Sequence, residues 1–316
     1  MTTAPHSTAS NGFQAQADAY AKARPSYPAE AIAFISSIMA DHQKPQKVLD
    51  LGAGTGIMTK LLVEKCGFQV TAVEPVDNMR LKLESILTQA SSVKGTAWSI
   101  PVQDESQAMV MLAQCFHWFD DIKSLKEIHR VLKPGGLIIL IWNMESRERS
   151  EWVAKLRDLY QVYDGSAPQY RMGHWKKVFG TEEAQALYTL PLQHKRFTFD
   201  VPAQRGHIWP RIMSKSYIAI LDQEKCDKLH QDVEAVLEDP KYNLPKNGSD
   251  QKFIYCHDTD MYWAHLIVEV NMMAIKNALA LRRIQQLLYF EEAGNGGLVD
   301  KQWTMRQVSS VVIQRR

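Results

Sequence analysis

One stretch, Lys47-Val-Leu-Asp-Leu-Gly-Ala-Gly-Thr-Gly56, constrains the possible folds of this chain more than any other part of the sequence. It is an apolar run containing Asp50, followed by three glycines at every second position. A second apolar run, Val70-Thr-Ala-Val, ends at Glu74, 18 residues after Gly56. A strand, a glycine turn, a helix and a second strand tipped by a carboxylate make up half of a nucleotide-binding α/β unit. The pattern therefore predicts a nucleotide at the carboxyl ends of parallel strands.

The spacing of the glycines narrows the choice of nucleotide. Gly52, Gly54 and Gly56 form a G-x-G-x-G pattern, and Ile57 stands where the third glycine of a dinucleotide site would be. An oxidoreductase with a nicotinamide cofactor, which is one alternative on this fold, is therefore disfavoured. The Glu74 carboxylate has only hydrogen-bond acceptors, which suits the two hydroxyls of a ribose.

From residue 47 onward, predicted strands alternate with predicted helices. Such alternation is typical of a parallel sheet covered by helices on both faces. After residue 143 the pattern changes to longer helices and irregular loops, which indicates a cap. The predicted strands are 48–51, 70–73, 93–98, 108–113, 137–142, 194–200 and 253–267, and the predicted helices are 14–23, 29–39, 58–65, 78–89, 123–131, 150–163, 205–221 and 224–237.

Composition argues against several classes of protein. A net charge of +2 over 316 residues gives no electrostatic reason to bind nucleic acid or an anionic membrane. The polar N-terminal segment has no signal-peptide core, and no apolar run is long enough to span a membrane. The four cysteines form no C-x-x-C pair, and the sequence has no metal-binding motif. We therefore expect a cytoplasmic protein with reduced thiols and no metal.

Four motifs resemble the successive motifs of class I S-adenosylmethionine-dependent methyltransferases: Val48–Gly56, Glu74–Met79, Gln114–Asp120 and Leu132–Leu137. Two further segments, Tyr20–Pro28 and Ser214–Ala219, resemble the small-molecule, type 11 branch that includes trans-aconitate and thiol methyltransferases. The resemblance extends over residues 13–266. It implies an α/β fold with a Rossmann-like, seven-stranded, mostly parallel sheet whose last strand is antiparallel, together with helical lid and cap insertions.

The resemblance also implies a division of the chain into parts. The segment that follows residue 267 has no counterpart in the family, which indicates an appended element. We expect a disordered lead-in over 1–12, lid helices over 13–46, a methyltransferase domain over 47–267 whose cap elements lie within 144–250, and a C-terminal extension over 268–316.

The resemblance implies that S-adenosylmethionine is the cofactor. It also implies which residues contact each part of the cofactor. Gly52, Ala53 and Gly54 would line its methionine part. Glu74 would hold the ribose hydroxyls. Asp50, at the end of the first strand, would either organise the glycine turn or bind a ligand amine.

Five further residues would complete the cofactor site. Met79 would pack on the adenine, with core packing as the alternative, and the backbone of Ala97 would meet the adenine edge. Gln114 would face the amino group or the sulfonium, or else cap its strand. Arg24 would pair with the cofactor carboxylate under a lid that Tyr20 closes, with an exposed arginine at a helix end as the alternative.

His117 lies just past the fourth predicted strand and is flanked by aromatic residues. It would face the transferred methyl group, as a base or as a donor that orients the acceptor. The alternative is a structural histidine wedged among aromatic rings. The aromatic candidates for the wall of an acceptor pocket, each of which could instead pack in the core, are Trp118, Trp142, Trp175 and Tyr217.

These observations together predict transfer of a methyl group from S-adenosylmethionine to a nucleophilic oxygen, sulfur or nitrogen of a small molecule in secondary metabolism. An acceptor that is already anionic needs no general base, whereas a phenol or alcohol would use His117. Two alternatives stay open: a methyltransferase-like protein that uses bound cofactor for a non-methylating reaction, such as a pericyclic one, and a non-catalytic binding subunit whose interface is the extension. We expect a monomer or homodimer with no nucleic-acid or membrane partner.

Overall fold

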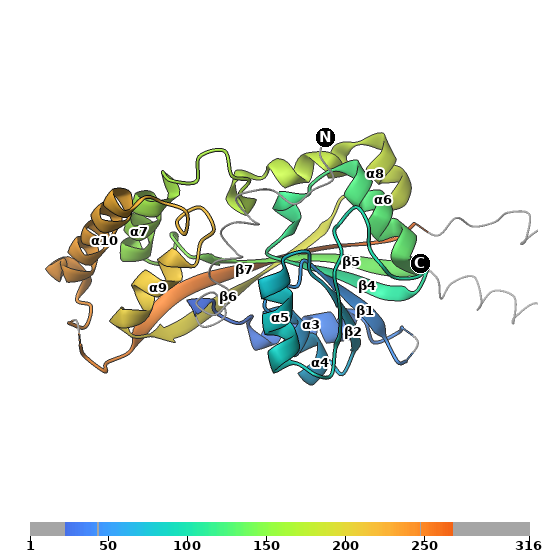
Figure 1. The fold of residues 1–316 in the computed structure, drawn as a ribbon, viewed down its shortest axis with the longest axis horizontal. Helices are drawn as coiled ribbons and strands as arrows, with labels where there is room; N and C mark the ends of the chain where they lie inside the picture. The colour runs from blue at the N-terminus through green and yellow to red at the C-terminus, as the bar shows by residue number, and fades with distance from the viewer. Residues whose placement is uncertain (1–22, 43, 247, 268–316) are drawn as a thin grey trace, which may run out of the picture. The chain divides into compact units, whose positions relative to one another are not determined.

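The computed structural model describes residues 23–42, 44–246 and 248–267. The lead-in, Tyr20, most of the predicted helix 14–23 and the extension 268–316 lie outside these residues, and the predicted domain boundaries stay predictions. A seven-stranded sheet has the order β3-β2-β1-β4-β5-β7-β6 (Figure 1). Its strands are β1 (Lys47–Leu51), β2 (Gln69–Val73), β3 (Ser91–Val93), β4 (Gln107–Ala113), β5 (Leu132–Glu145), β6 (Gln193–Ala203) and β7 (Phe253–His265).

Strands β1 to β5 pair in parallel, whereas β7 pairs antiparallel with both β5 and β6. This confirms the predicted mostly parallel sheet. The apolar stretches of β4 and β5 are buried, as expected for strands with both faces covered. The last strands extend beyond the parallel part of the sheet, so that Glu145 at the end of β5 pairs with His257 of β7.

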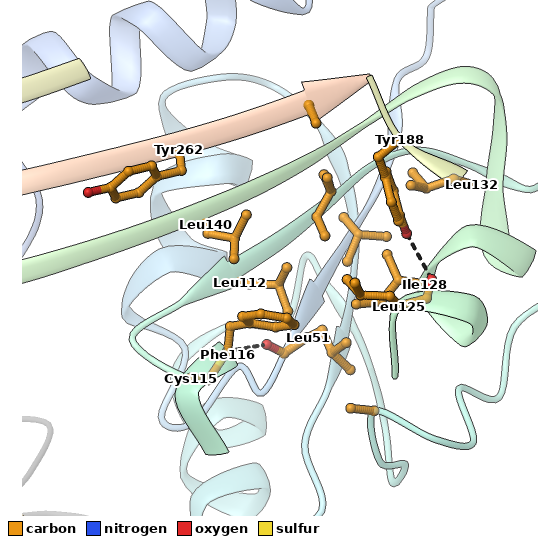
Figure 2. Close-up of a cluster of buried hydrophobic side chains, with 14 of the residues drawn as sticks. Leu51, Leu112, Cys115, Phe116, Leu125, Ile128, Leu132, Leu140, Tyr188 and Tyr262 are labelled. Atoms are coloured by element: carbon orange, nitrogen blue, oxygen red, sulfur yellow. Dashed lines mark hydrogen bonds between the residues drawn. The ribbon is translucent and has the colours of Figure 1, made fainter. Parts of the chain in front are cut away.

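Helices cover both faces of the sheet because alternate strand residues point to opposite sides. On one face Met109 and Ile139 pack with α3 and α4, and on the other Leu112 and Leu140 pack with α6 and α8 (Figure 2). A third cluster joins α7, α9 and α10 at the far ends of β6 and β7, where they form the cap (Figure 1). The helices are α3 (Ala29–Ile38), α4 (Ile57–Glu64), α5 (Asp77–Ile86), α6 (Ile122–Val131), α7 (Glu151–Gln161), α8 (Glu182–Leu187), α9 (Ile208–Met213) and α10 (Gln223–Glu238), with 3₁₀ turns η1 (Phe116–Trp118), η2 (Tyr170–Met172), η3 (His174–Gly180), η4 (Arg205–His207) and η5 (Pro240–Tyr242).

Two predicted elements are wrong. The predicted strand 93–98 is wrong because β3 covers only Ser91–Val93, and the chain then makes a turn that is closed by two backbone hydrogen bonds of 3.2 Å between Thr96 and Ser99. The predicted helix 205–221 is only a 3₁₀ turn and the short α9, after which the chain turns and Lys215 meets Glu145. That contact joins residues 70 positions apart, and no local periodicity signals it. Within the described ranges, no helix is both long and apolar enough to cross a membrane.

Candidate cofactor and acceptor site

The glycine loop connects β1 to α4 and lies at the carboxyl edge of the sheet. The amides of Gly52 and Ala53 donate to the carbonyl of Val73 at 2.8 and 3.2 Å, which holds the loop against β2. Gly52, Gly54 and Gly56 have φ values of +70°, +58° and +87°. Side chains other than glycine rarely adopt such values, so the backbone conformation itself requires the glycines.

A pocket opens over this loop, and we call it the cofactor pocket. It contains about 480 Å³ of space that no atom fills, including space open to solvent. A β-carbon on Gly54 would meet no atom within 4 Å, so the loop leaves this space free. The lining residues are Arg24, Pro25, Tyr27, Gly52, Ala53, Gly54, Thr55, Ile57, Met58, Ala113, Gln114 and Arg211.

Glu74 is tied to the glycine loop from the neighbouring strand. Its two carboxylate oxygens accept hydrogen bonds from the amides of Gly54 and Val76, both at 2.8 Å. The side chain is nearly buried, and burial raises the pKa of the Glu74 carboxyl to about 7. Each oxygen still has an acceptor site, because a carboxylate oxygen can accept more than one bond.

Asp50 lies beneath the loop rather than in the pocket lining. It is fully buried, and its Oδ2 accepts a hydrogen bond from the hydroxyl of Thr59 at 2.6 Å. Its Oδ1 is buried without a hydrogen-bond partner among the described residues. Burial raises the pKa of this carboxyl to about 6. Of the two roles predicted for Asp50, the geometry favours organisation of the turn.

The remaining predicted cofactor residues divide into two groups. Arg24 and Gln114 line the cofactor pocket. The backbone of Gln114 has a strained φ of +61°, and its side-chain amide nitrogen donates to the backbone carbonyl of Asn143 at 3.0 Å. Met79 and Ala97 are buried and do not line it, so their adenine contacts stay predictions.

A second pocket, which we call the acceptor pocket, lies between the end of β5 and the cap. It contains about 650 Å³ of unfilled space, open solvent included. Arg24, Gln114 and Arg211 line both pockets, so the two adjoin. The lining residues are Arg24, Gln114, His117, Trp118, Asn143, Met144, Glu145, Tyr160, Gln161, Gln169, Tyr170, Arg171, Arg211, Lys215, Ser216 and Tyr217.

His117 has a partner that its sequence context did not reveal. The indole N–H of Trp142 donates to Nδ1 of His117 at 3.2 Å. Since tryptophan can only donate, Nδ1 is the unprotonated nitrogen and Nε2 carries the hydrogen. Burial, followed by the charge of Arg24, lowers the pKa of His117 to about 3. His117 therefore offers a donor, and this tautomer disfavours the general-base role.

The four aromatic wall candidates do not share one location. Trp118 and Tyr217 line the acceptor pocket. Trp142 does not: it is fully buried on the sheet face covered by η3 and stacks on Tyr170 at 4.5 Å. Trp175 is also buried and lines an outer pocket, which adjoins the acceptor pocket at Met144, Glu145, Tyr170 and Arg171. The structure thus places Trp142 in the core and Trp175 at the outer pocket, and their roles in acceptor binding stay predictions.

Three charged residues of the acceptor pocket were missed in the sequence. Arg211 Nη2 and Lys215 Nζ lie 2.7 and 3.0 Å from the same oxygen of Glu145. All three side chains are buried. The available signals were weak: Glu145 follows a long apolar run, and Arg211 and Lys215 are four positions apart in a helix-like segment.

Comparison with known proteins identifies the family to which this chain belongs. A family model described as a methyltransferase domain matches residues 49–140. An uncharacterized methyltransferase of Mycobacterium bovis is 42% identical over 147 residues, 46% of this chain, and the match spans only 58% of that relative. An uncharacterized methyltransferase of Schizosaccharomyces pombe is 30% identical over 223 residues, covering 69% of this chain and 84% of that protein.

The fold has counterparts among solved structures. A structure from Anaeromyxobacter dehalogenans, described as a type II methyltransferase, matches 78% of this chain and 98% of that one. The TM-score is 0.53 and the sequence identity is 15%, so this likeness concerns the fold alone.

Proposed function

Because the chain belongs to the class I S-adenosylmethionine-dependent methyltransferases of type 11, we propose that it transfers a methyl group from this cofactor to a nucleophilic oxygen, sulfur or nitrogen of a small molecule. The observation that carries the proposal is the junction of the two pockets at Arg24, Gln114 and Arg211. A donor over the glycine loop and an acceptor under the cap would meet there.

The residues of the cofactor pocket fit S-adenosylmethionine. The open space at Gly54 leaves room for a ligand against the loop backbone. Glu74 does not line this pocket, but it accepts a hydrogen bond from Gly54 and has further acceptor sites for ribose hydroxyls. Gly52, Ala53 and Gly54 would hold the methionine part, with Arg24 close to its carboxylate. When bound, the cofactor supplies a methyl group already activated on a sulfonium.

The chain itself would mainly orient the acceptor and exclude water. In-line displacement on an activated methyl group depends on the alignment of the two reactants. Gln114 lines both pockets, and its side chain is held by the carbonyl of Asn143. His117 would direct its Nε2–H toward the acceptor, which suits an oxygen or sulfur that carries negative charge.

The experiment that tests this function uses a mixture of natural small molecules in place of a chosen acceptor. The protein is incubated with methyl-labelled S-adenosylmethionine and an extract of the organism that encodes it, beside the Gly54→Val variant. We expect label in the fraction that passes ultrafiltration, with one S-adenosylhomocysteine formed for each labelled product. Label only in macromolecules would contradict a small-molecule acceptor. Product without S-adenosylhomocysteine would favour the non-methylating alternative, and absence of cofactor binding would favour a non-catalytic subunit.

His117→Phe should lower the rate of methyl transfer by about 10- to 100-fold, since one hydrogen bond to a charged group is lost. The affinity for S-adenosylhomocysteine should not change, because His117 does not line the cofactor pocket. His117→Asn keeps a donor and should restore part of the rate. Rates are measured by label transfer, and affinities by calorimetry.

The same variants decide between donor and base. With a pKa of about 3, His117 stays neutral at physiological pH, and the wild-type rate should show no histidine titration between about pH 5 and 8. A titration in that range that disappears in His117→Asn would establish a base and contradict the donor role.

A further inference from the structure

The outer pocket, which Trp175 lines, adjoins the acceptor pocket. It contains about 840 Å³ of unfilled space, open solvent included, and ligand pockets commonly have volumes of this order. The residues that line both pockets are Met144, Glu145, Tyr170 and Arg171. A molecule held in the acceptor pocket can therefore extend into the outer pocket past these residues.

The outer pocket follows β7. Asp258, Asp260 and Tyr262 are alternate residues of this strand, so their side chains point to the same face of the sheet, and all three line the pocket. Asp258 pairs with Met144, which also lines the acceptor pocket, and so marks the near end. At about 3.3 Å per residue, the strand covers about 13 Å from Asp258 to Tyr262. A ligand that fills both pockets must therefore be elongated.

Lys176 lies at the Tyr262 end of the outer pocket. Its ammonium nitrogen is 5.0 Å from the centroid of the Tyr262 ring and 5.5 Å from that of the Trp175 ring. The two rings attract the cation and fix its position, but they do not neutralise its charge. Within residues 23–42, 44–246 and 248–267, Lys176 forms no ion pair with a carboxylate. Since an ammonium group has three N–H donors, Lys176 can still donate to a ligand.

The arginines that line the outer pocket are already engaged with other groups. Arg157 is buried, and its Nη1 donates to the backbone carbonyl of Glu145 at 2.7 Å. The other lining arginines, each in an ion pair with an aspartate, are Arg147, Arg171 and Arg196. Of the lining cations, Lys176 is therefore the one best placed to bind a ligand.

The carboxylates of the outer pocket each have a cationic partner, so they repel an anion less than free carboxylates would. Asp260 is buried and accepts from Nε and Nη2 of Arg196 at 2.8 and 3.0 Å. It also accepts from the hydroxyl of Tyr170 at 2.8 Å. The other lining carboxylates, each in an ion pair, are Glu145, Glu148 and Asp258. An anionic group beside Lys176 would supply the carboxylate-like partner that this lysine lacks in the described ranges.

We propose that the outer pocket binds the distal part of an elongated acceptor and that Lys176 contacts an anionic group at its far end. This rests on the methyltransferase function proposed above. The nucleophile lies in the acceptor pocket, so the methylated atom and the anionic group are different parts of one molecule. Binding of the distal part orients the nucleophile. Short or neutral acceptors are disfavoured because they leave Lys176 without a partner.

Calorimetry on the full chain loaded with S-adenosylhomocysteine tests this proposal with simple probes. Sebacate is a long carboxylate, succinate is a short one, and tetraethylene glycol is a long neutral chain. Sebacate should bind saturably, and the other two should bind at least about 10-fold more weakly, because each lacks either the length or the charge. Competition by acetate and by inorganic phosphate at equal concentration distinguishes a site for carboxylate from one for phosphate.

Lysine variants test the contact with the anionic group. Lys176→Met should weaken sebacate binding by about 10-fold or more, because a charged hydrogen bond is lost. Lys176→Arg keeps the charge and should restore most of the affinity. Lys177→Met is the matched control, because Lys177 is the next residue of η3 and does not line the outer pocket. It should bind sebacate as the wild type does.

Glycine variants test the pocket itself. Gly173 lines the outer pocket with a φ of +71°, and a β-carbon there would meet no atom within 4 Å. Gly173→Trp should therefore fill the pocket and abolish sebacate binding without changing S-adenosylhomocysteine affinity. Gly165→Trp is the matched control: Gly165 has a φ of +54° and equal space for a β-carbon, but it does not line the pocket. Thermal melting is measured for every variant.

The outcomes separate this proposal from the function on which it rests. If the wild type binds S-adenosylhomocysteine but not sebacate, or if Lys176→Met or Gly173→Trp binds sebacate as tightly as the wild type, the outer-pocket assignment is wrong and the methyltransferase proposal stands. If S-adenosylhomocysteine does not bind, the proposed function fails, and with it the role of the outer pocket in acceptor binding.

The labelling experiment with the extract gives an independent measurement. Because the anionic group is not the methylated one, the labelled product should be retained by an anion exchanger. Gly173→Trp should form less of this product than Gly165→Trp does. A labelled product that passes the exchanger, or one that both variants form equally, would contradict the proposal.

Discussion

Gly54→Val should abolish binding of S-adenosylmethionine while the protein still folds. A β-carbon at this position meets no protein atom within 4 Å, so the side chain does not clash with the core. It would occupy the space over the loop where we propose that the methionine part lies. The backbone at φ +58° adds strain of about 1–2 kcal/mol, which lowers stability without preventing folding. Calorimetry with S-adenosylhomocysteine and thermal melting measure the two effects.

Gly67→Val is the matched control for this variant. Gly67 has a φ of +70°, and a β-carbon there also meets no atom within 4 Å. It lies between α4 and β2, outside the lining of the cofactor pocket. The control should lose similar stability and keep cofactor affinity. If both variants bind the cofactor as the wild type does, the proposed position of the cofactor against Gly54 is wrong.

Glu74→Ala should weaken cofactor binding by at least about 10-fold. The variant loses the proposed acceptor for the ribose and also the oxygens that hold the amides of Gly54 and Val76. The second effect loosens the glycine loop itself. As a control, Glu84→Ala removes a carboxylate that pairs with Arg80 on α5, and it should have little effect on affinity. Unchanged affinity in Glu74→Ala would exclude the ribose assignment.

The pKa of Glu74 adds a pH dependence with a definite sign. Ribose hydroxyls would donate to the ionised carboxylate, so cofactor affinity should rise as the pH rises through about 7 and then level off. Folding responds in the opposite direction. The folded-state pKa of Glu74 is raised from 4.5 to about 7, so its contribution to the free energy of unfolding decreases as the pH rises across that interval.

The folded-state pKa of Asp50 is likewise raised, from 3.8 to about 6, so the contribution of Asp50 to the free energy of unfolding also decreases as the pH rises across that interval. As the pH rises, cofactor affinity measured by calorimetry should therefore increase, while stability measured by denaturant titration should decrease. Glu74→Gln should remove most of the pH dependence of affinity, and persistence of that dependence in the variant would assign it to another group.

Much of the fold could be predicted because it is encoded in short stretches of sequence. The apolar run before Gly52, the glycine turn and the apolar run before Glu74 each define their element locally, and the structure confirms all three. Two elements were predicted wrongly. The segment 93–98 contains a turn closed by Thr96 and Ser99, and the helix predicted after Arg205 is interrupted before Lys215 meets the distant Glu145.

The α/β fold and the location of the cofactor pocket could be predicted from sequence, because strand ends and glycine turns depend on neighbouring residues. The construction of the acceptor side becomes visible only in the folded chain. Trp142 acts on the site through His117, and Glu145 meets Lys215 across 70 positions of chain. Neither contact has a sequence period. The Trp142–His117 contact depends on the pairing of β5 with β4, which η1 follows, and the Glu145–Lys215 contact depends on how the cap packs against the end of β5. The glycines therefore indicate the donor, whereas the acceptor depends on charges that come together only in the folded protein.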